Sequence, residues 1–287
     1  MKFRNKNIVV TGAGGGVGRQ LVLQLLEKGA SVAAVDISTE ALAETRRQAG
    51  TLAEKLSLHL ADITDRSAVG SLPEKIMAVH GRIDGLINNA GIIQPFLPLS
   101  ELESVSVERL MNINFYGMMN MTRAFLPYLA EQPEAQIGNV SSMGGFLPVP
   151  GQAVYGASKA AVKIATEGLR MELSRTGIGV SLILPGGIET DIKKNSGLAD
   201  AEVTEEAKKS AGLKLTRPEE AARIILAGME KNKAKILIGS DARIMDILYR
   251  LMPQRAGKMI RGVMAANHGG IFNRTEDLRI SSRAKVS

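Results

Sequence analysis

The feature that most constrains this chain is a run of five glycines within residues 12–18, placed between an apolar strand and an amphipathic helix. Residues 8–10 are fully apolar and predict a strand, and leucines at helical spacing predict a helix over 17–28, ended by Gly29. A second apolar strand is expected over 31–35. Glycines at such a turn let the backbone approach a pyrophosphate at the helix N-terminus. The alternative is a glycine-rich turn without a ligand, but the register of strand, turn and helix favours a bound dinucleotide.

Asp36 ends the second predicted strand and bears on which dinucleotide would bind. A carboxylate at this position accepts a hydrogen bond from a ribose 2′-hydroxyl and repels a 2′-phosphate. The turn carries Gly15, and no basic residue precedes Gly16. We therefore expect NAD(H), with NADP(H) as the alternative because Arg19 lies in the first helical turn.

Strands and helices continue to alternate along the chain. Helices are expected over 39–48, 66–79 and 106–129, and strands over 56–60, 83–87, 137–140, 179–184 and 235–239. This alternation predicts an α/β fold, a single doubly wound parallel sheet of about seven strands with helices on both faces. Ligands of such sheets bind at the carboxyl ends of the strands, where Gly12, Asp36, Asp62 and Asn88 are all expected to lie.

Tyr155 and Lys159 lie four residues apart in a segment with helical periodicity, so their side chains are expected on one face. A phenol loses its proton near pH ~10, and a fixed cation nearby lowers that pKa. Such a phenol could exchange a proton with an alcohol or ketone near neutral pH. Taken alone, the pair is also explained by a tyrosine at a helix start with a surface lysine one turn later.

Further polar residues are expected near this pair. The strand over 137–140 leads into Ser141 and Ser142, and the strand over 179–184 leads into Pro185 and Gly186. Asn114 interrupts an apolar stripe of the helix over 106–129, where it could equally be a buried amide bonded to a neighbour.

With these residues in place, the chain resembles the short-chain dehydrogenase/reductase family, with a Rossmann-type domain, over roughly residues 6 to 240. The matching motifs are Thr11-Gly-Ala-Gly-Gly-Gly-Val-Gly18, Asp62, Asn88-Asn-Ala-Gly91, Asn114, Ser142, Tyr155-x-x-x-Lys159, and Pro185-Gly186 followed by Thr190. The glycine spacing, wider than G-x-G-x-x-G, points to the same family.

The resemblance implies a role for each matched residue. Tyr155 would be the acid/base, Lys159 would lower its pKa and bind the nicotinamide ribose, and Ser142 would bind the substrate oxygen. Asn114 would hold a water that links Lys159 to solvent. The expected catalytic residues are Asn114, Ser142, Tyr155 and Lys159. The expected cofactor-binding residues are Gly12, Gly14, Gly15, Gly16, Val17, Gly18, Asp36, Asp62, Ile63, Asn89, Ala90, Gly91, Tyr155, Lys159, Pro185, Gly186, Ile188 and Thr190. Asp62 would contact the adenine and Thr190 the nicotinamide carboxamide, Asn88 and Gly91 would support the sheet edge, and no metal is expected.

Composition excludes several other chemistries. The 287 residues include no cysteine, which rules out disulfides, thiolate metal sites and a cysteine nucleophile. His59, His80 and His268 are far apart, lack metal-ligand spacing and are expected in loops or on the surface. The apolar run after the basic N-terminus is too short for a signal peptide, and no run approaches the ~18 apolar residues of a membrane span. A cytoplasmic enzyme is the default expectation.

Beyond residue 240 the chain continues past the end of most members of that family. We expect residues 1–240 to form the catalytic domain, 241–268 an amphipathic helical extension and 269–287 a disordered tail. Residues 198–213 match, by position, the mobile lid of the family. From Lys214 onward there are fifteen Lys and Arg against seven Asp and Glu. The apolar stripes of the extension are expected to pack on the domain or on a second subunit, and an anionic membrane is the alternative partner.

The function expected is hydride transfer between NAD(H) and a secondary alcohol or ketone, with a hydrophobic, lipid-like, steroid-like or acyl substrate. The apolar stretches 92–97 and 146–149 support that substrate class. The alternative from another class is a catalytically silent dinucleotide-binding sensor or scaffold, which the joint presence of Ser142, Tyr155 and Lys159 disfavours. By resemblance a homodimer or homotetramer is expected. Nucleic-acid binding is not, because no aromatic residues interleave the C-terminal basic residues.

Overall fold

A computed structural model describes residues 1–189, 192, 196 and 215–267, the last five of these as backbone only. The expected lid over 198–213, the tail from 269, Thr190 and His268 lie outside these residues. Within the described part of the chain, no helix is long and apolar enough to cross a membrane.

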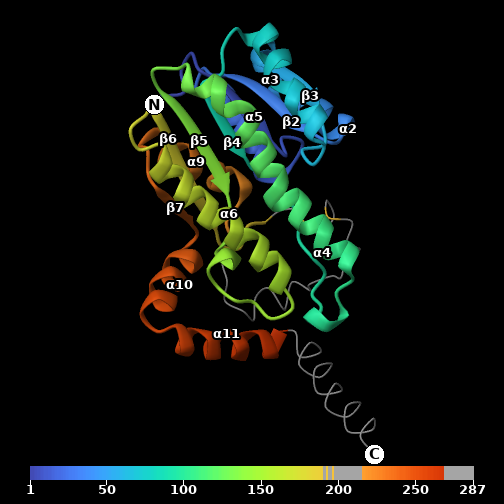
Figure 1. The fold of residues 1–287 in the computed structure, drawn as a ribbon, viewed down its shortest axis with the longest axis vertical. Helices are drawn as coiled ribbons and strands as arrows, with labels where there is room; N and C mark the ends of the chain where they lie inside the picture. The colour runs from blue at the N-terminus through green and yellow to red at the C-terminus, as the bar shows by residue number, and fades with distance from the viewer. Residues whose placement is uncertain (190–191, 193–195, 197–214, 268–287) are drawn as a thin grey trace, which may run out of the picture.

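Seven parallel strands form one sheet, as the alternation predicts (Figure 1). They are β1 (Asn7–Thr11), β2 (Ser31–Asp36), β3 (Leu56–Leu60), β4 (Gly85–Asn88), β5 (Ala135–Val140), β6 (Ile178–Pro185) and β7 (Lys235–Ile238). Their order across the sheet is β3-β2-β1-β4-β5-β6-β7. Because the chain adds strands outward from β1 on one side and then returns to its other side, the connections after β1 and β4 diverge. A crevice opens at the carboxyl ends of these two strands.

Helices cover both faces of the sheet (Figure 1). The first face carries α1 (Gly16–Glu27), α2 (Thr39–Ala49) and α9 (Pro218–Glu230), and the second carries α3 (Arg66–His80), α5 (Met118–Ala130) and α6 (Ala153–Glu172). Leu21, Leu25 and Ile225 belong to the core under the first face. Ile76, Met121 and Phe125 belong to the core under the second. The apolar residues that gave each helix its period are therefore those that bury it against the sheet.

Two predicted elements differ from the structure. The helix expected over 106–129 is divided into α4 (Ser104–Met111), a π-helical turn η3 (Asn112–Gly117) and α5. The strand expected over 83–87 is β4, which runs from Gly85 to Asn88. Sequence periodicity does not predict the π-helical turn, because such turns are rare and occur mostly as single turns within α-helices.

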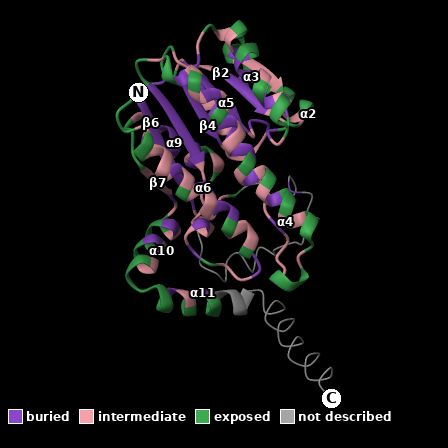
Figure 2. Cartoon of the chain, in the orientation of Figure 1, coloured by how far each residue is buried: buried purple, intermediate pink, exposed green. Residues whose placement is uncertain are grey.

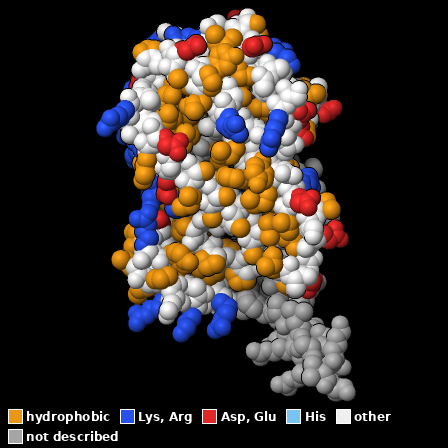
Figure 3. All heavy atoms as spheres, viewed as in Figure 1, with side chains coloured by type: hydrophobic (Ala, Val, Ile, Leu, Met, Phe, Trp, Pro, Cys, Tyr) orange, Lys and Arg blue, Asp and Glu red, His pale blue; other side chains and the backbone are white. Residues whose placement is uncertain are grey.

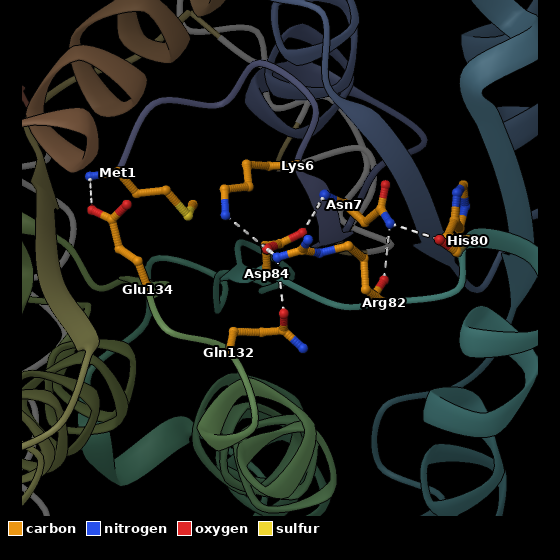
Figure 4. A network of polar contacts seen from close by, with 8 residues as sticks. All are labelled: Met1, Lys6, Asn7, His80, Arg82, Asp84, Gln132 and Glu134. Carbon is orange, nitrogen blue, oxygen red and sulfur yellow. Dashed lines mark hydrogen bonds and ion pairs between the residues drawn. The ribbon is translucent and has the colours of Figure 1, made fainter.

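At the amino end of the strands, a buried carboxylate joins β1 to β4 (Figure 4). Asp84, whose side chain has no exposed surface, accepts from Lys6 Nζ at 3.0 Å and from the Asn7 backbone N–H at 3.0 Å. It also pairs with Arg82, which donates to Gln132 on the other side. A buried charge with several donors avoids the desolvation cost of an isolated one. This end of the sheet is thus closed by a polar network, and the opposite end is left for a ligand.

His59 and His80, expected to be unrelated loop or surface residues, lie together. The Ser57 hydroxyl is 2.7 Å from His59 Nε2 and 2.7 Å from His80 Nε2. The hydroxyl donates to one ring and accepts from the other, so both rings stay neutral with linked tautomers. Burial, aided by the charges of His80 and Lys75, lowers the pKa of His59 to about 4, and burial also lowers the pKa of His80. The described residues contain no group of three metal-ligating side chains.

This pair predicts a loss of stability in mild acid. The unfolded chain binds protons at His59 near its ordinary pKa of 6.5, whereas the folded chain does so only near pH 4. The free energy of unfolding therefore falls as the pH drops between these values. From about pH 7.5 to about pH 5, His59 should account for a loss of about 1 kcal/mol, discounted for its partial exposure. In urea unfolding, the free energy of unfolding of His59→Gln should fall less between these two pH values than that of the wild type. An identical loss in both proteins would contradict the assignment.

The C-terminal extension forms two helices, α10 (Ser240–Leu251) and α11 (Pro253–Asn267) (Figure 2). Their apolar stripes are expected to pack on the domain or on a second subunit. In the single chain Ile244, Ile247 and Leu251 are 62%, 61% and 73% exposed, so they do not pack on the domain, and packing on a second subunit stays a prediction. The residues that face inward are small or polar, namely Ala242, Asp246 and Ala256, together with Ile260. Packing of α10 on the domain therefore uses the side opposite its apolar stripe, whereas Ile260 of the α11 stripe faces inward.

Candidate active site

One large cavity, of about 1260 Å³, lies at the carboxyl ends of the strands. It extends from the turn after β1, past the ends of β2 and β4, to the N-terminal half of α6 and the loop after β6. This is where a doubly wound sheet binds ligands. The volume accommodates a dinucleotide together with a small substrate.

The glycine-rich turn forms the floor of the cavity at the N-terminus of α1. Gly12 and Gly16 have positive φ angles of 64° and 49°, which residues with a side chain rarely adopt. A Cβ at Gly18 would lie 1.8 Å from Gly12 O, so this glycine is required for the helix to pack against the turn. The helix N-terminus carries no side-chain cap and no acid in its first turn. Its free backbone N–H groups therefore suit a phosphate.

Two neighbouring residues hold this turn in place. Thr11 Oγ1 accepts hydrogen bonds from the backbone N–H groups of Asn89 (3.0 Å) and Ala90 (3.1 Å). The Asn89 amide donates in return to Thr11 O and Gly12 O at 3.1 and 3.3 Å. The ends of β1 and β4 are thus fixed relative to each other on both sides of the crevice.

Asp36 and Arg19 both line the cavity beyond the turn. Asp36 Oδ2 accepts from the Gly14 backbone N–H at 2.8 Å, and its Oδ1 accepts from the Ser38 backbone N–H at 3.1 Å. Arg19 donates to Thr45 Oγ1 at 3.0 Å and to Gly14 O. The carboxylate at the end of β2 is therefore held in a fixed orientation, and a cation lies across the same turn.

Ser142, Tyr155 and Lys159 lie together in the other half of the cavity. Ser142 Oγ accepts from the Gly144 backbone N–H at 3.0 Å and is hydrogen-bonded to the Tyr155 phenol. Lys159 is 4% exposed, and its Nζ donates to Val140 O at 3.1 Å. Tyr155 is held at the start of α6 by a hydrogen bond of 2.8 Å from its backbone N–H to Gln94 Oε1.

The protonation of this group differs from the sequence-based expectation. In the chain alone, burial raises the pKa of Tyr155, and the hydrogen bond with Ser142 offsets part of that rise. Burial also lowers the pKa of Lys159 to about 8. We expected Lys159 to lower the pKa of Tyr155, but desolvation of the phenol is the larger effect here. At neutral pH, Tyr155 is a neutral phenol and Lys159 is mostly protonated.

Asn114 lies behind the cavity wall, where it bonds to neighbouring protein groups. Its Oδ1 accepts from Ile92 N at 2.8 Å, and its Nδ2 donates to Ile92 O and Ser158 Oγ, both at 3.0 Å. A Cβ built at Gly91 would lie 3.0 Å from Lys159 Nζ and 3.1 Å from Asn114 Oδ1. The amide thus connects the π-helical turn to the loop after β4 and to α6, beside the lysine.

Replacing Asn114 should therefore affect stability as well as activity. Asn114→Ala removes the partners of two backbone groups of the half-buried Ile92 and one partner of the buried Ser158 hydroxyl, which costs about 3 kcal/mol. The midpoint of thermal unfolding should fall by roughly 6–12 °C. Asn112→Ala, at an exposed position in the same turn, is the matched control and should shift it little. Equal shifts in the two variants would show that the hydrogen bonds of Asn114 are not responsible.

Most of the predicted site residues line this one cavity. They are Gly12, Gly14, Gly15, Gly16, Val17, Asp36, Asp62, Ile63, Asn89, Ala90, Gly91, Ser142, Tyr155, Lys159, Pro185, Gly186 and Ile188. Gly18 and Asn114 support the wall without lining it, and Thr190 lies outside the described residues. Asp62 Oδ1 accepts from the backbone and hydroxyl of Thr64, both at 2.8 Å, so this carboxylate also fixes a local turn.

Sequence reasoning missed three buried or anchoring polar residues. Gln94 and Gln152 are 2% and 3% exposed, and the Gln152 amide donates to Gln94 O at 3.0 Å. Asp241, in the first turn of α10, accepts from the Gly187 backbone N–H at 2.8 Å and so joins the C-terminal helices to the loop after β6. An acid in the first turn of a helix is common, and no sequence signal identifies its distant partner.

Comparison with known proteins agrees with this geometry. The short chain dehydrogenase family model matches residues 6–201. The putative oxidoreductase SadH of Mycobacterium tuberculosis is 35% identical over 267 residues, covering 92% of this chain and 96% of that protein. The 3-oxoacyl-[acyl-carrier-protein] reductase FabG of Thermotoga maritima is 34% identical, covering 79% of this chain and 91% of that protein.

A solved structure supports the same assignment. A short chain dehydrogenase from Burkholderia cenocepacia in complex with NADP superposes with a TM-score of 0.76 at 28% identity, covering 91% of this chain and 99% of that one. This chain belongs to the short-chain dehydrogenase family and is an NAD(P)-dependent dehydrogenase or reductase acting on CH–OH or C=O groups.

Proposed function

We propose that this enzyme transfers a hydride between NAD(H) and a hydrophobic ketone or secondary alcohol, with Tyr155 as the proton donor and acceptor. The observation that carries the proposal is the group formed by Ser142, Tyr155 and Lys159 in the cavity whose other half is the glycine-rich turn. The bound nicotinamide supplies or accepts the hydride at the substrate carbon. The chain supplies orientation, a proton and hydrogen bonds to the substrate oxygen.

The hydrogen bonds around Ser142 and Tyr155 support a proton path between the phenol and the substrate oxygen. Because the Gly144 N–H already donates to Ser142 Oγ, the serine hydroxyl proton is left for the Tyr155 oxygen or for a substrate oxygen between them. The neutral phenol then donates its proton to the oxygen that becomes an alkoxide as hydride reaches the carbonyl carbon. The charge of Lys159 stabilises the phenolate that remains. Oxidation of an alcohol is the same sequence in reverse.

The substrate half of the cavity favours an apolar substrate. Ile93, Phe96, Met143 and Val149 line it, close to Ser142 and Tyr155. Three of these residues, Ile93, Phe96 and Val149, belong to the apolar stretches 92–97 and 146–149. The FabG relative, named for a 3-oxoacyl substrate, supports an acyl ketone as one member of this class.

A panel of carbonyl compounds tests the proposal. Oxidation of NADH should be faster with medium-chain acyl and alicyclic ketones than with short, polar ones, because the longer chains bury more apolar surface. The competing function, a silent dinucleotide sensor, predicts cofactor binding in a fluorescence titration without turnover of any panel member. A preference for small polar ketones would contradict the hydrophobic substrate class.

We also propose that the enzyme is a homo-oligomer paired through the long helices around the site. Ile164 and Met171, seven residues apart on one side of α6, are 64% and 75% exposed, and Tyr116 in the π-helical turn is 48% exposed. Ile164→Glu should shift the mass measured by light scattering toward the monomer. Val79→Glu, at an exposed position on α3, is the control and should leave it unchanged.

A further inference from the structure

The outer sides of α10 and α11 form an exposed face that the catalytic role does not explain. It consists of apolar and basic side chains of these two helices, here called the α10–α11 face: Arg243, Ile244, Ile247, Leu251, Met252, Arg255, Lys258, Met259 and Arg261. Figure 3 shows hydrophobic side chains gathered over the two helices, with Lys and Arg side chains along the edge next to them. The apolar members are 37% to 73% exposed.

The inward sides of the same helices account for their packing. Ala242, Ala256 and Ile260 are buried, and Asp246 pairs with Lys235 at 2.7 Å and with Arg250 at 3.3 Å. Asp241 is bonded to Gly187. Both acidic residues of α10 therefore already have partners within the chain, and α11 contains no acidic residue. The charge presented outward is positive.

The basic residues of the face are not neutralised by the protein. Arg243, Arg255, Lys258 and Arg261 form no ion pair with any acid in the described part of the chain. A symmetric contact with the same face of a second copy would bring these cations against each other, which is unfavourable. An anionic surface that also accepts aliphatic side chains complements both properties of the face.

We infer that the α10–α11 face binds the surface of an anionic membrane, with Ile244, Ile247 and Leu251 inserted between head groups and the basic residues at the phosphates. α10 packs against η4 (Met143–Gly145), and Asp241 holds Gly187, so this face adjoins the mouth of the cavity. An apolar substrate could then pass from the lipid to Ser142 and Tyr155 with little exposure to water. Binding to membrane does not depend on the proposed reaction and is tested without it.

The experiment is co-sedimentation of the full chain with phosphatidylcholine vesicles, with and without phosphatidylglycerol. We expect binding to the anionic vesicles only, lost in about 1 M salt, where the screening length falls to about 3 Å. Changing Arg255, Lys258 and Arg261 together to Gln should lower the partition coefficient on the order of a hundredfold. Changing Lys2, Lys55 and Lys231 to Gln removes the same charge elsewhere and should lower it far less.

A second pair of variants tests the apolar contribution. Ile247→Asn should weaken vesicle binding about tenfold, and Val79→Asn, at a position equally exposed at 61%, should not. Absence of binding, or equal losses in the face variants and their controls, would overturn the inference. So would a change in oligomeric state with Ile247→Asn in light scattering, which would identify a second copy as the occupant. Turnover of soluble ketones should be unchanged in these variants, so a failed proposal on catalysis would not be confused with this one.

Discussion

Replacing Tyr155 with Phe should reduce kcat for ketone reduction about 10³-fold while leaving the affinity for NADH within about twofold of the wild type. The Tyr155 phenol lies in the cavity beside Ser142 and carries an ionisable proton that can pass to the substrate oxygen. Phenylalanine keeps the ring and its packing beside Gly144 but has no proton to give to the alkoxide oxygen. The loss should therefore appear in kcat and not in cofactor binding.

Steady-state kinetics and a fluorescence titration with NADH measure the two quantities separately. Tyr128→Phe, a partly buried tyrosine of α5 away from the cavity, is the matched control and should retain normal turnover. If Tyr155→Phe kept wild-type kcat, another group would have to deliver the proton. If it lost NADH affinity in proportion to turnover, Tyr155 would act through cofactor binding instead.

The parts of the site that follow from sequence are those fixed by local pattern. The strand–glycine–helix unit placed Gly12 and Asp36 at strand ends, and four-residue spacing on one helix brought Tyr155 and Lys159 to one side. In a parallel sheet every strand delivers its last residue to the same edge, so correct strands suffice to collect these residues in one cavity. Most of the predicted cofactor and catalytic residues line it for this reason.

The features that sequence did not predict depend on contacts between distant residues. Asp241 accepts a hydrogen bond from Gly187, and Ser57 links His59 to His80. These contacts depend on the tertiary structure, which no periodic pattern in the sequence predicts. The direction in which the pKa of Tyr155 shifts in the chain alone depends on such contacts too. Spacing locates the nearby cation, but the desolvation that raises the pKa of the phenol depends on the whole surrounding structure.

The outward face of α10 illustrates the same limit at the level of packing. Periodicity identifies the stripe of Ile244, Ile247 and Leu251, and amphipathic helices usually bury such a stripe. Here Ala242 and Asp246 face the domain instead. Which side of a helix packs inward depends on its partner surface, and here Lys235 on β7 pairs with Asp246.

The second large effect concerns cofactor choice at Asp36. The wild type should use NADH with a kcat/KM about 10²-fold above that for NADPH, and Asp36→Asn should remove most of that difference. The 2′-phosphate of NADPH would lie against a carboxylate fixed by Gly14 and Ser38. The repulsion between two such charges near a protein surface amounts to a few kcal/mol. About 3 kcal/mol corresponds to the expected factor. With the carboxylate neutralised, Arg19, which lines the same cavity and is bonded to the same turn, is expected to favour the phosphate.

Asp62→Asn is the matched control, because Asp62 lines the same cavity but its carboxylate is held by Thr64 at the end of β3. That variant should change kcat/KM for both cofactors alike and leave their ratio within about twofold. The Burkholderia cenocepacia relative was solved with NADP, so use of NADPH by the wild type is the outcome to compare with this prediction. If the wild type used NADPH as well as NADH, Arg19 would outweigh Asp36 at the turn, and the carboxylate would serve to hold the Gly14 backbone and not to select the ribose.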